Sequence, residues 1–161
     1  MRAQRVLTMW VYGKPITQGS KTRGRFGMYD DNARTLKPWR DKVCLTAKHA
    51  VKRSRWQATA TAVHVYVLFA FDRPATHYRK VVRNRTVVDR KLRDDAPPYP
   101  LTTKSSGDID KLLRAIFDGL TAGGVWRDDV QVVSVSADKV WVGEPFAPQL
   151  TGARIRVAEV A

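Results

Sequence analysis

Apolar side chains recur along the chain at two different periods, and these periods predict the secondary structure. Strict alternation marks the strands, and the clearest case is residues 59–71, where Val63, Val65, Val67 and Phe69 share one face. Residues 5–12, 130–142 and 153–160 form further predicted strands. The apolar phase slips between Val132 and Val133, which predicts a β-bulge at that point.

Two other segments repeat their apolar residues at intervals of three and four, which is typical of amphipathic helices. Residues 38–54 begin with Pro38, which suits the first turn of a helix. Residues 109–120 carry the strongest helical pattern in the chain, with six apolar residues: Ile109, Leu112, Leu113, Ile116, Phe117 and Leu120. The order β-α-β-α-β-β predicts an α+β fold with a mixed or antiparallel sheet and two main helices.

Residues 17–35 and 73–106 show no period, and both are predicted to be loops. The first is rich in Gly, Thr and Arg and either lies along a phosphate chain or is a solvated loop. The second is basic and holds four prolines, so we expect it to be ordered in part only on nucleic acid. The length of 161 residues fits one domain, residues 1–161, with no internal repeat.

The net charge of the chain indicates the class of molecule that it binds. The chain has 29 Lys and Arg residues against 15 Asp and Glu, a net charge of +14, which favours a polyanion and usually nucleic acid. A charge that serves only solubility is the alternative. The candidate DNA contacts lie in the two basic loops and beside the first: Lys14, Lys21, Arg23, Arg25, Arg79, Lys80, Arg83 and Arg85.

Other classes of protein are disfavoured. A single cysteine excludes a disulfide scaffold and a cysteine-based zinc finger. The longest apolar stretch, residues 62–71, is too short to span a bilayer, and the first residues lack the features of a signal peptide. We therefore expect a cytoplasmic protein with no membrane partner and no small-molecule cofactor.

The acidic residues are concentrated in a different part of the chain from the basic loops. Five of the fifteen lie between residues 108 and 129. These are Asp108, Asp110, Asp118, Asp128 and Asp129. An acidic cluster in a chain that attracts phosphates repels the same ligand unless a divalent cation bridges the two, and hard oxygen ligands favour Mg²⁺ or Mn²⁺. To bring Asp129 to the first pair, the chain must turn at Gly123-Gly124 and run back along the helix.

Each acid also has an ordinary structural explanation. Asp108 suits the N-cap of the second helix, and Asp110 suits its first turn. Arg114 can form i,i+4 ion pairs with Asp110 and Asp118. Asp128-Asp129 can be a plain turn.

The segment GDIDKLLRAIFDGLTAGGVWRDDVQVVSV, residues 107–135, resembles the signature of the RusA-type Holliday-junction resolvases. This resemblance implies a small, dimeric, magnesium-dependent endonuclease. Carried over by position, it implies that Asp108, Asp110 and Asp129 bind the metal, with Asp128 as the neighbouring acid. The chain departs from the family pattern twice: the usual essential Lys is Arg114, and the usual Asn is Lys111.

The chemistry expected of such a site is hydrolysis of a phosphodiester by a metal-activated hydroxide, which leaves 5′-phosphate and 3′-hydroxyl ends. Arg114 or Lys111 would supply a cation to the phosphate. Two opposed cuts in a four-way junction need two sites, which a C2 homodimer provides. The strand from Val63 to Phe69 or the apolar helix would contribute the subunit contact.

Two alternatives predict different behaviour. A non-enzymatic basic DNA- or RNA-binding protein would bind in a salt-sensitive way without metal-dependent nicking. A nuclease of the restriction-like fold would need a carboxylate followed by Glu-x-Lys on a strand, and no such run follows these aspartates.

Overall fold

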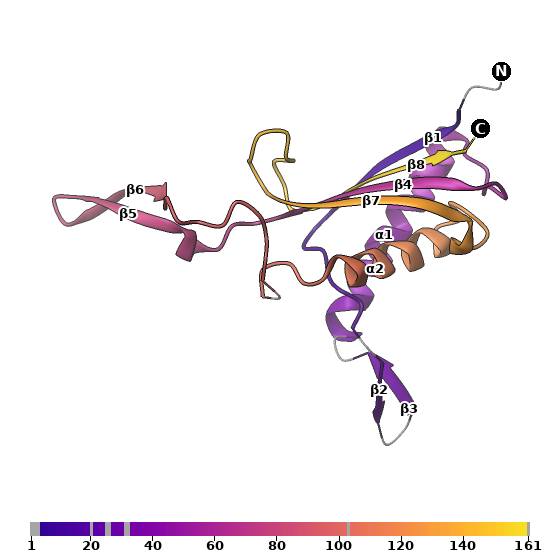
Figure 1. Cartoon of the computed structure of the whole chain (residues 1–161), viewed down its shortest axis with the longest axis horizontal. Helices are drawn as coiled ribbons and strands as arrows, with labels where there is room; N and C mark the ends of the chain where they lie inside the picture. The colour runs from indigo at the N-terminus through magenta and orange to yellow at the C-terminus, as the bar shows by residue number, and fades with distance from the viewer. Residues whose placement is uncertain (1–3, 20, 25–26, 31–32, 103, 161) are drawn as a thin grey trace.

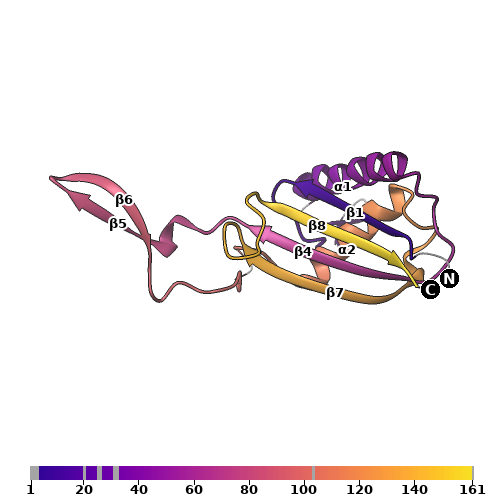
Figure 2. The ribbon, with the colours of Figure 1, turned by 90° about the horizontal axis from the view of Figure 1, so that it is seen from above.

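Four strands form the central sheet in the order β1-β8-β4-β7, as Figures 1 and 2 show. They are β1 (Val6–Tyr12), β4 (Val63–Phe71), β7 (Val132–Trp141) and β8 (Gly152–Glu159). β4 and β7 are parallel, whereas β8 is antiparallel to both β1 and β4. This computed structural model describes residues 4–19, 21–24, 27–30, 33–102 and 104–160. The predicted α+β fold with a mixed sheet is confirmed.

The β-bulge predicted in β7 is also confirmed. Val63 pairs with Val132, but the next residue, His64, pairs with Ser134, so Val133 has no partner across the ladder. The extra residue explains the slip in apolar phase, because it reverses which side of the strand each later residue faces.

Both long helices, α1 (Ala33–Ser54) and α2 (Ile109–Ala122), cover the same face of the sheet (Figure 2). The core lies between them and the alternate residues of the strands, with Val65, Phe69 and Ile155 among its buried members. Neither α1 nor α2, nor any other described helix, has the length and apolar character that crossing a membrane requires.

The prediction that α1 starts at Pro38 was wrong, because the helix starts at Ala33 and holds Pro38 in its interior. Leu36 lies one turn before Trp39 on the same apolar stripe, and only 1% of its surface is exposed. Burying a leucine contributes about 2 kcal/mol. This offsets much of the cost of the hydrogen bond that Pro38 cannot donate.

Both predicted loops contain hairpins instead. Residues 17–35 include β2 (Lys21–Gly24) paired with β3 (Gly27–Asp30). Residues 73–106 include the short 3₁₀ helix η1 (Ala75–His77) and the pair β5 (Tyr78–Arg83) and β6 (Thr86–Leu92). The sequence does not reveal these strands, because charged residues stand among their few apolar ones and hide the alternation. Asn84 and Arg85, both with positive φ, form a two-residue turn of the kind that joins tight hairpins.

The two helices approach closely where α2 presents glycines. A Cβ on Gly119 would lie 2.6 Å from Cγ1 of Val43 and 3.3 Å from the backbone oxygen of Arg40. A Cβ on Gly123, one turn later, would lie 2.4 Å from that of Ala47. The missing side chains therefore set the distance between α1 and α2, and with it the position of the outer face of α2.

The substitution Gly119→Ala is expected to lower the free energy of unfolding by about 1–2 kcal/mol, because overpacking outweighs the gain in helix propensity. Val43 cannot turn away easily, since its branched side chain is stiff. Chemical denaturation measures the change, and Ala122→Ser at an exposed position of the same helix is the control. An unchanged or raised stability of Gly119→Ala would show that the close approach is not a constraint.

Candidate active site

The outer face of α2 carries an alternating row of charges. Asp110, Arg114 and Asp118 follow one another at intervals of four residues, so they lie on one face of the helix, and all three are exposed. The opposite face is buried in the core through Leu112, Ile116 and Leu120, among others. The apolar pattern that fixes α2 on the sheet therefore also turns this acid–base–acid row to solvent.

At the start of α2, Asp108 occupies the N-cap position but makes no capping hydrogen bond with its side chain. Its carboxylate instead accepts a hydrogen bond from Lys111 Nζ, 2.8 Å away. This bond, followed by the positive charges of Lys111 and Lys139, holds the pKa of Asp108 below its ordinary value. The carboxylate is thus kept ionised and is not used up as a helix cap.

Lys139 reaches this end of α2 from β7. Its ammonium group donates hydrogen bonds to Ser106 Oγ at 3.0 Å and to the Gly107 carbonyl at 2.9 Å. These bonds fix the two residues just before Asp108 against the sheet. Sequence reasoning missed Lys139, because the contact joins residues 32 and 33 positions apart and no local pattern marks it.

The segment after β1 also meets the first turn of α2. The backbone N–H of Gln18 donates to the Lys111 carbonyl at 2.9 Å. The side-chain oxygen of Gln18 is buried, and it has no hydrogen-bond partner among the described residues. A buried acceptor without a donor favours a cation or a donor group nearby.

Beyond α2, Asp128 builds a turn. It caps the 3₁₀ helix η2 (Asp129–Gln131) by accepting from the Val130 N–H at 3.0 Å. Gln131 completes the cap, because its Oε1 accepts from the N–H groups of Arg127 and Asp128. The Nε2 of Gln131 donates to the carbonyls of Thr59 and Thr61, which ties the turn to the chain just before β4. Asp128 therefore has the ordinary structural role in a turn that the sequence offered as an alternative. Gln131, to which the sequence analysis assigned no role, stabilises this turn.

The surroundings of Asp129 disfavour its ionised form. Although the residue is exposed, partial desolvation of its carboxyl raises its pKa above the ordinary value, and a hydrogen bond with Asp128 and the negative charges of Asp128 and Asp118 raise it further. A cation near Asp129 would remove this penalty by neutralising the accumulated charge.

The chain turns back after Gly123-Gly124, where the sequence analysis placed the turn, and it runs beside the last turns of α2. Trp126 is buried, donates to Thr121 Oγ1 at 2.7 Å and packs edge-on against Phe117. This return brings η2 into contact with α2 and places Asp129 within the electrostatic reach of Asp118. Asp118 lies eight residues after Asp110, about 12 Å along a helix.

The aspartates thus lie in two groups, Asp108 and Asp110 at the first turn of α2 and Asp129 beside Asp118 farther along. In the part of the chain that the structure describes, no three side chains of the Asp, Glu, His or Cys type come together as a metal site. The assignment of Asp108, Asp110 and Asp129 to one ion stays a prediction.

The two departures from the family pattern differ in their surroundings. Lys111 is engaged with Asp108, and its pKa is raised chiefly by that hydrogen bond. Arg114 is exposed and forms no ion pair with any described residue, and Asp118 pairs with Arg40 on α1 at 3.4 Å instead. The expected i,i+4 pairs of Arg114 are therefore not formed, which leaves its guanidinium available to a ligand.

The predicted DNA contacts fall in three places. Lys14 is exposed just after β1. Arg79, Lys80 and Arg83 are exposed on β5, and Arg85 is exposed in the turn that follows. Lys21 and Arg23 belong to β2, but their side chains lie outside the described part of the chain, as does the whole of Arg25.

Comparison with known proteins gives one assignment. A search of curated proteins found no match to this chain. The family described as endodeoxyribonuclease RusA matches over residues 13–147, a span that contains both groups of aspartates, Arg114 and the β5–β6 hairpin. The chain therefore belongs to the RusA family of endodeoxyribonucleases, enzymes that cut branched DNA at junctions.

Proposed function

We propose that this protein is a Mg²⁺-dependent endonuclease that resolves four-way DNA junctions, with Asp108, Asp110 and Asp129 as metal ligands. The observation that carries the proposal is the exposed row Asp110–Arg114–Asp118 on α2, with Asp129 beside its far end. A chain of charge +14 that belongs to a nuclease family has a functional reason to keep such a row of acids exposed.

The donor set suits a hard cation. Carboxylate oxygens are the ligands that Mg²⁺ and Mn²⁺ prefer, and Asp108, Asp110 and Asp129 are all exposed. The raised pKa of Asp129 is a feature that a nearby cation would relieve. When bound, Mg²⁺ would lower the pKa of a water molecule and stabilise charge on the phosphate oxygens.

The side chains of the protein bind the phosphate and position the metal ligands. Arg114 lies between the two groups of aspartates, where its guanidinium contacts the scissile phosphate and stabilises the charge that develops there. Lys111 keeps Asp108 ionised and in place. Hydrolysis forms a bond from water oxygen to phosphorus and breaks the bond from phosphorus to the 3′ oxygen. The 3′ oxygen takes up a proton, so the products are a 3′-hydroxyl and a 5′-phosphate.

Asp110→Asn and Asp129→Asn are each expected to lower the rate of junction cleavage about 100-fold or more. Junction binding persists or tightens, because each change removes a negative charge near phosphate. A gel assay with a synthetic four-way junction, with Mg²⁺ or with EDTA, measures both. Asp41→Asn is the matched control, since Asp41 is an exposed acid that pairs only with Lys37 among the described residues.

Full cleavage by both variants would contradict the metal assignment. A wild-type protein that binds junctions but never nicks them with Mg²⁺ or Mn²⁺ would contradict the proposed nuclease activity. The protein would then be a DNA-binding protein without enzymatic activity.

Substitutions at Arg114 and Lys111 separate their roles. Arg114→Gln is expected to lower kcat at least about tenfold, because a free guanidinium is lost from the phosphate, whereas Arg114→Lys retains most of the activity. Lys111→Gln is expected to act through Asp108 and to raise the Mg²⁺ concentration needed for half-maximal rate. Single-turnover cleavage over a Mg²⁺ titration measures these effects. Equal rates for Arg114→Gln and wild type would remove Arg114 from the mechanism.

The protein acts as a homodimer, so that two sites can make opposed cuts. Of the surfaces suggested by the sequence, the apolar side of α2 and the inward face of β4 are buried within the chain, whereas the outward face of β4 carries the exposed His64 and the half-buried Tyr66. The uncovered face of the sheet is the remaining candidate. Across it run Trp10, Arg154, Leu68 and Asp138 in one row of neighbouring strands.

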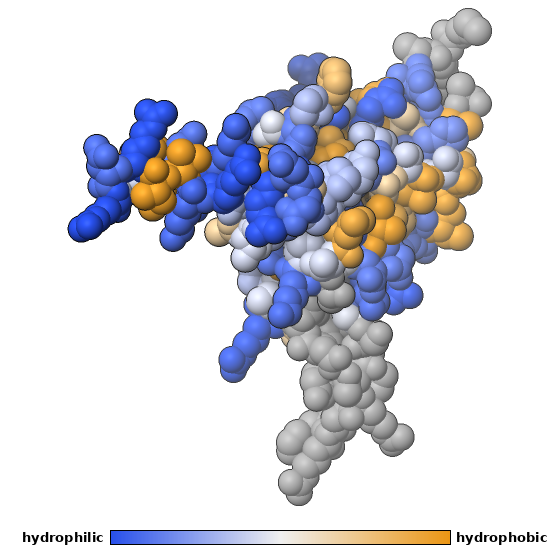
Figure 3. Space-filling model, turned by 60° about the vertical axis from the view of Figure 1, so that its left-hand side comes forward, coloured by the Kyte–Doolittle hydropathy of each residue, from blue (hydrophilic) through white to orange (hydrophobic). Residues whose placement is uncertain are grey.

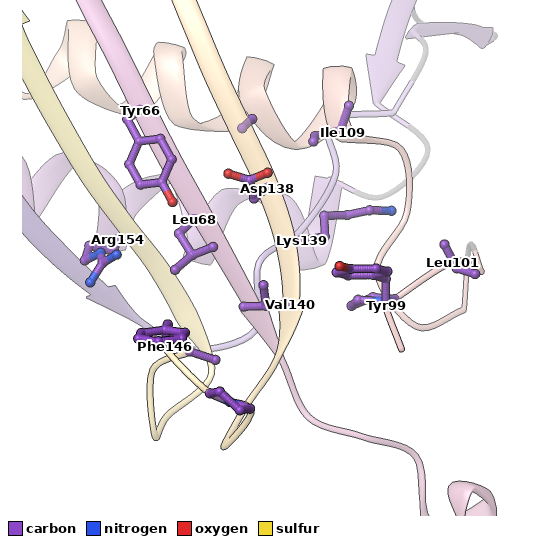
Figure 4. Close-up of a pocket in the computed structure, with 14 residues that line it drawn as sticks. Tyr66, Leu68, Tyr99, Leu101, Ile109, Asp138, Lys139, Val140, Phe146 and Arg154 are labelled. Carbon is purple, nitrogen blue, oxygen red and sulfur yellow. The ribbon is translucent and has the colours of Figure 1, made fainter. Parts of the chain in front are cut away.

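Figure 4 shows Leu68, Asp138 and Arg154 around a hollow of about 520 Å³, with Phe146 at its rim. Phe146 is 99% exposed. A two-fold axis along β4 above Leu68 would place Asp138 of one copy against Arg154 of the other, because both flank Leu68 at one strand spacing. This charge complementarity favours a second copy as the occupant.

Asp138→Arg and Arg154→Asp are each expected to weaken the dimer at least about tenfold, and the combined variant restores it, because the exchanged charges pair again. Sedimentation velocity over a concentration series measures the dissociation constant, with Asp41→Arg as the control. A wild-type protein that stays monomeric, or single variants that dimerise normally, would contradict this surface.

A further inference from the structure

The hairpin of β5 and β6, here called the ribbon (residues 78–92), projects away from the sheet and helices (Figures 1 and 2). Every residue of β6 is exposed, and in β5 only Tyr78 and Val81 are half-buried. A two-stranded hairpin with no face packed on a core is marginally stable. Its shape therefore indicates a partner that covers it.

The base of the ribbon is firmly attached to the end of β7. Trp141 is buried there, and its indole N–H donates to the Pro97 carbonyl at 2.9 Å. Arg73 packs its guanidinium over the Trp141 ring and pairs with Glu144. The His77 ring packs edge-on against Trp141, and the His77 carbonyl accepts a hydrogen bond from the Arg93 N–H. Both ends of the ribbon are thus held at the end of the sheet where Lys139 contacts the start of α2.

The charge of the ribbon selects the kind of partner. The ribbon contains six Lys and Arg against one acid, Asp89. A ribbon of a second copy, with the same net charge of +5, would repel it, and so would the rest of this basic chain. A duplex nucleic acid, with a negative charge about every 1.7 Å, attracts it.

The register of the two strands separates two faces. One face carries the pairs Tyr78 with Leu92, Lys80 with Arg90 and Val82 with Val87, and it has no acid. The other face carries Arg79 with Lys91, Val81 with Asp89 and Arg83 with Thr86. Val88 is the extra residue of a bulge between them.

Near the tip, the acid-free face is apolar. Val82 is 56% exposed and Val87 is 48% exposed, directly across the ladder from each other. Figure 3 shows hydrophobic residues gathered on the projecting arm among hydrophilic ones. Exposed valines amid cations suit a surface that touches both the phosphates and the apolar parts of bases.

We propose that the ribbon lies in the major groove of a DNA arm beside the cut site, with its acid-free face toward the base edges and its cations on the flanking phosphates. The inference rests on the proposed function in that DNA is the ligand. The major groove is about 12 Å wide and admits a two-stranded ribbon, whereas the minor groove is about half as wide. Exposed methyl groups such as those of Val82 and Val87 can contact the methyl group of thymine on the groove floor.

The turn at the tip of the ribbon allows its charge to be removed without unfolding the two strands. Asn84 has φ of 48° and Arg85 has φ of 62°, a conformation in which glycine is favoured over arginine. Arg85→Gly therefore improves the turn while it removes a cation. This variant keeps the ribbon folded, so a loss of DNA binding cannot be attributed to unfolding.

The first experiment measures binding of a 30-base-pair duplex to Asp110→Asn protein in EDTA over a range of salt concentrations. Arg85→Gly is expected to reduce the slope of log affinity against log salt by about 0.9, and Lys80→Gln/Arg90→Gln by about 1.8. Lys48→Gln/Lys52→Gln on exposed positions of α1 has the same charge change as the pair and is expected to leave the slope unchanged.

The second experiment locates the groove. Val82→Thr/Val87→Thr is expected to weaken binding about tenfold without changing the salt slope, while Val81→Thr on the other face stays within about twofold. Bulky substituents at C5 of the pyrimidines, which fill the major groove, are expected to weaken wild-type binding and to have less effect on Val82→Thr/Val87→Thr. A minor-groove ligand such as netropsin is expected not to compete.

Ribbon variants that bind like their controls would overturn the proposal, as would competition by netropsin without an effect of the C5 substituents. A change in oligomeric state of Val82→Thr/Val87→Thr with unchanged affinity would overturn it in favour of subunit contact. Because the assays contain no metal, failure of the nuclease assignment leaves the ribbon result standing, and failure of the ribbon leaves Mg²⁺-dependent cleavage intact.

Discussion

The parallel pairing of β4 with β7 is the constraint on which the rest of the structure depends. Two parallel neighbours cannot be joined by a tight turn, so the chain must cross over the sheet, and α2 makes that crossing. The helix has to bury one side against the sheet and α1, which leaves Asp110, Arg114 and Asp118 on the other. The candidate chemistry therefore lies on a rigid element whose orientation is fixed by the core.

The same crossing explains why the acids fall into two groups. Asp108 precedes the crossover helix and Asp129 follows it, so the length of α2 lies between them in sequence. The return through Trp126 recovers part of that distance by bringing Asp129 alongside Asp118. Gly119 and Gly123 matter here as well, because the depth at which α2 packs on α1 sets the position of the outer face along which these groups lie.

The strongly periodic parts of the fold could be predicted from sequence, because burial imposes the period directly. α2, β4 and even the bulge at Val133 followed from the order of apolar residues. The ribbon could not, because no core side imposes an alternation on it, and Arg and Lys stand among its apolar residues. Its one local signal was Asn84, a residue that tolerates positive φ in a hairpin turn.

The site was predictable in its residue types but less so in its contacts. Spacing alone offered Arg114 two aspartate partners on its own helix, yet Asp118 pairs with Arg40 of α1, which tertiary packing brings near. The sequence makes Lys111 an equal candidate for the phosphate contact, but in the structure this side chain is bound to Asp108. Arg114 and the ribbon then have the same property. Each is a cationic group held in place by the fold that forms no ion pair with the described residues, and the nearest such pair to the ribbon joins Arg93, just after it, to Asp95. Cations kept apart from a protein's own acids lose no interaction within the chain when they bind phosphate. A duplex can therefore engage them without first breaking ion pairs inside the chain.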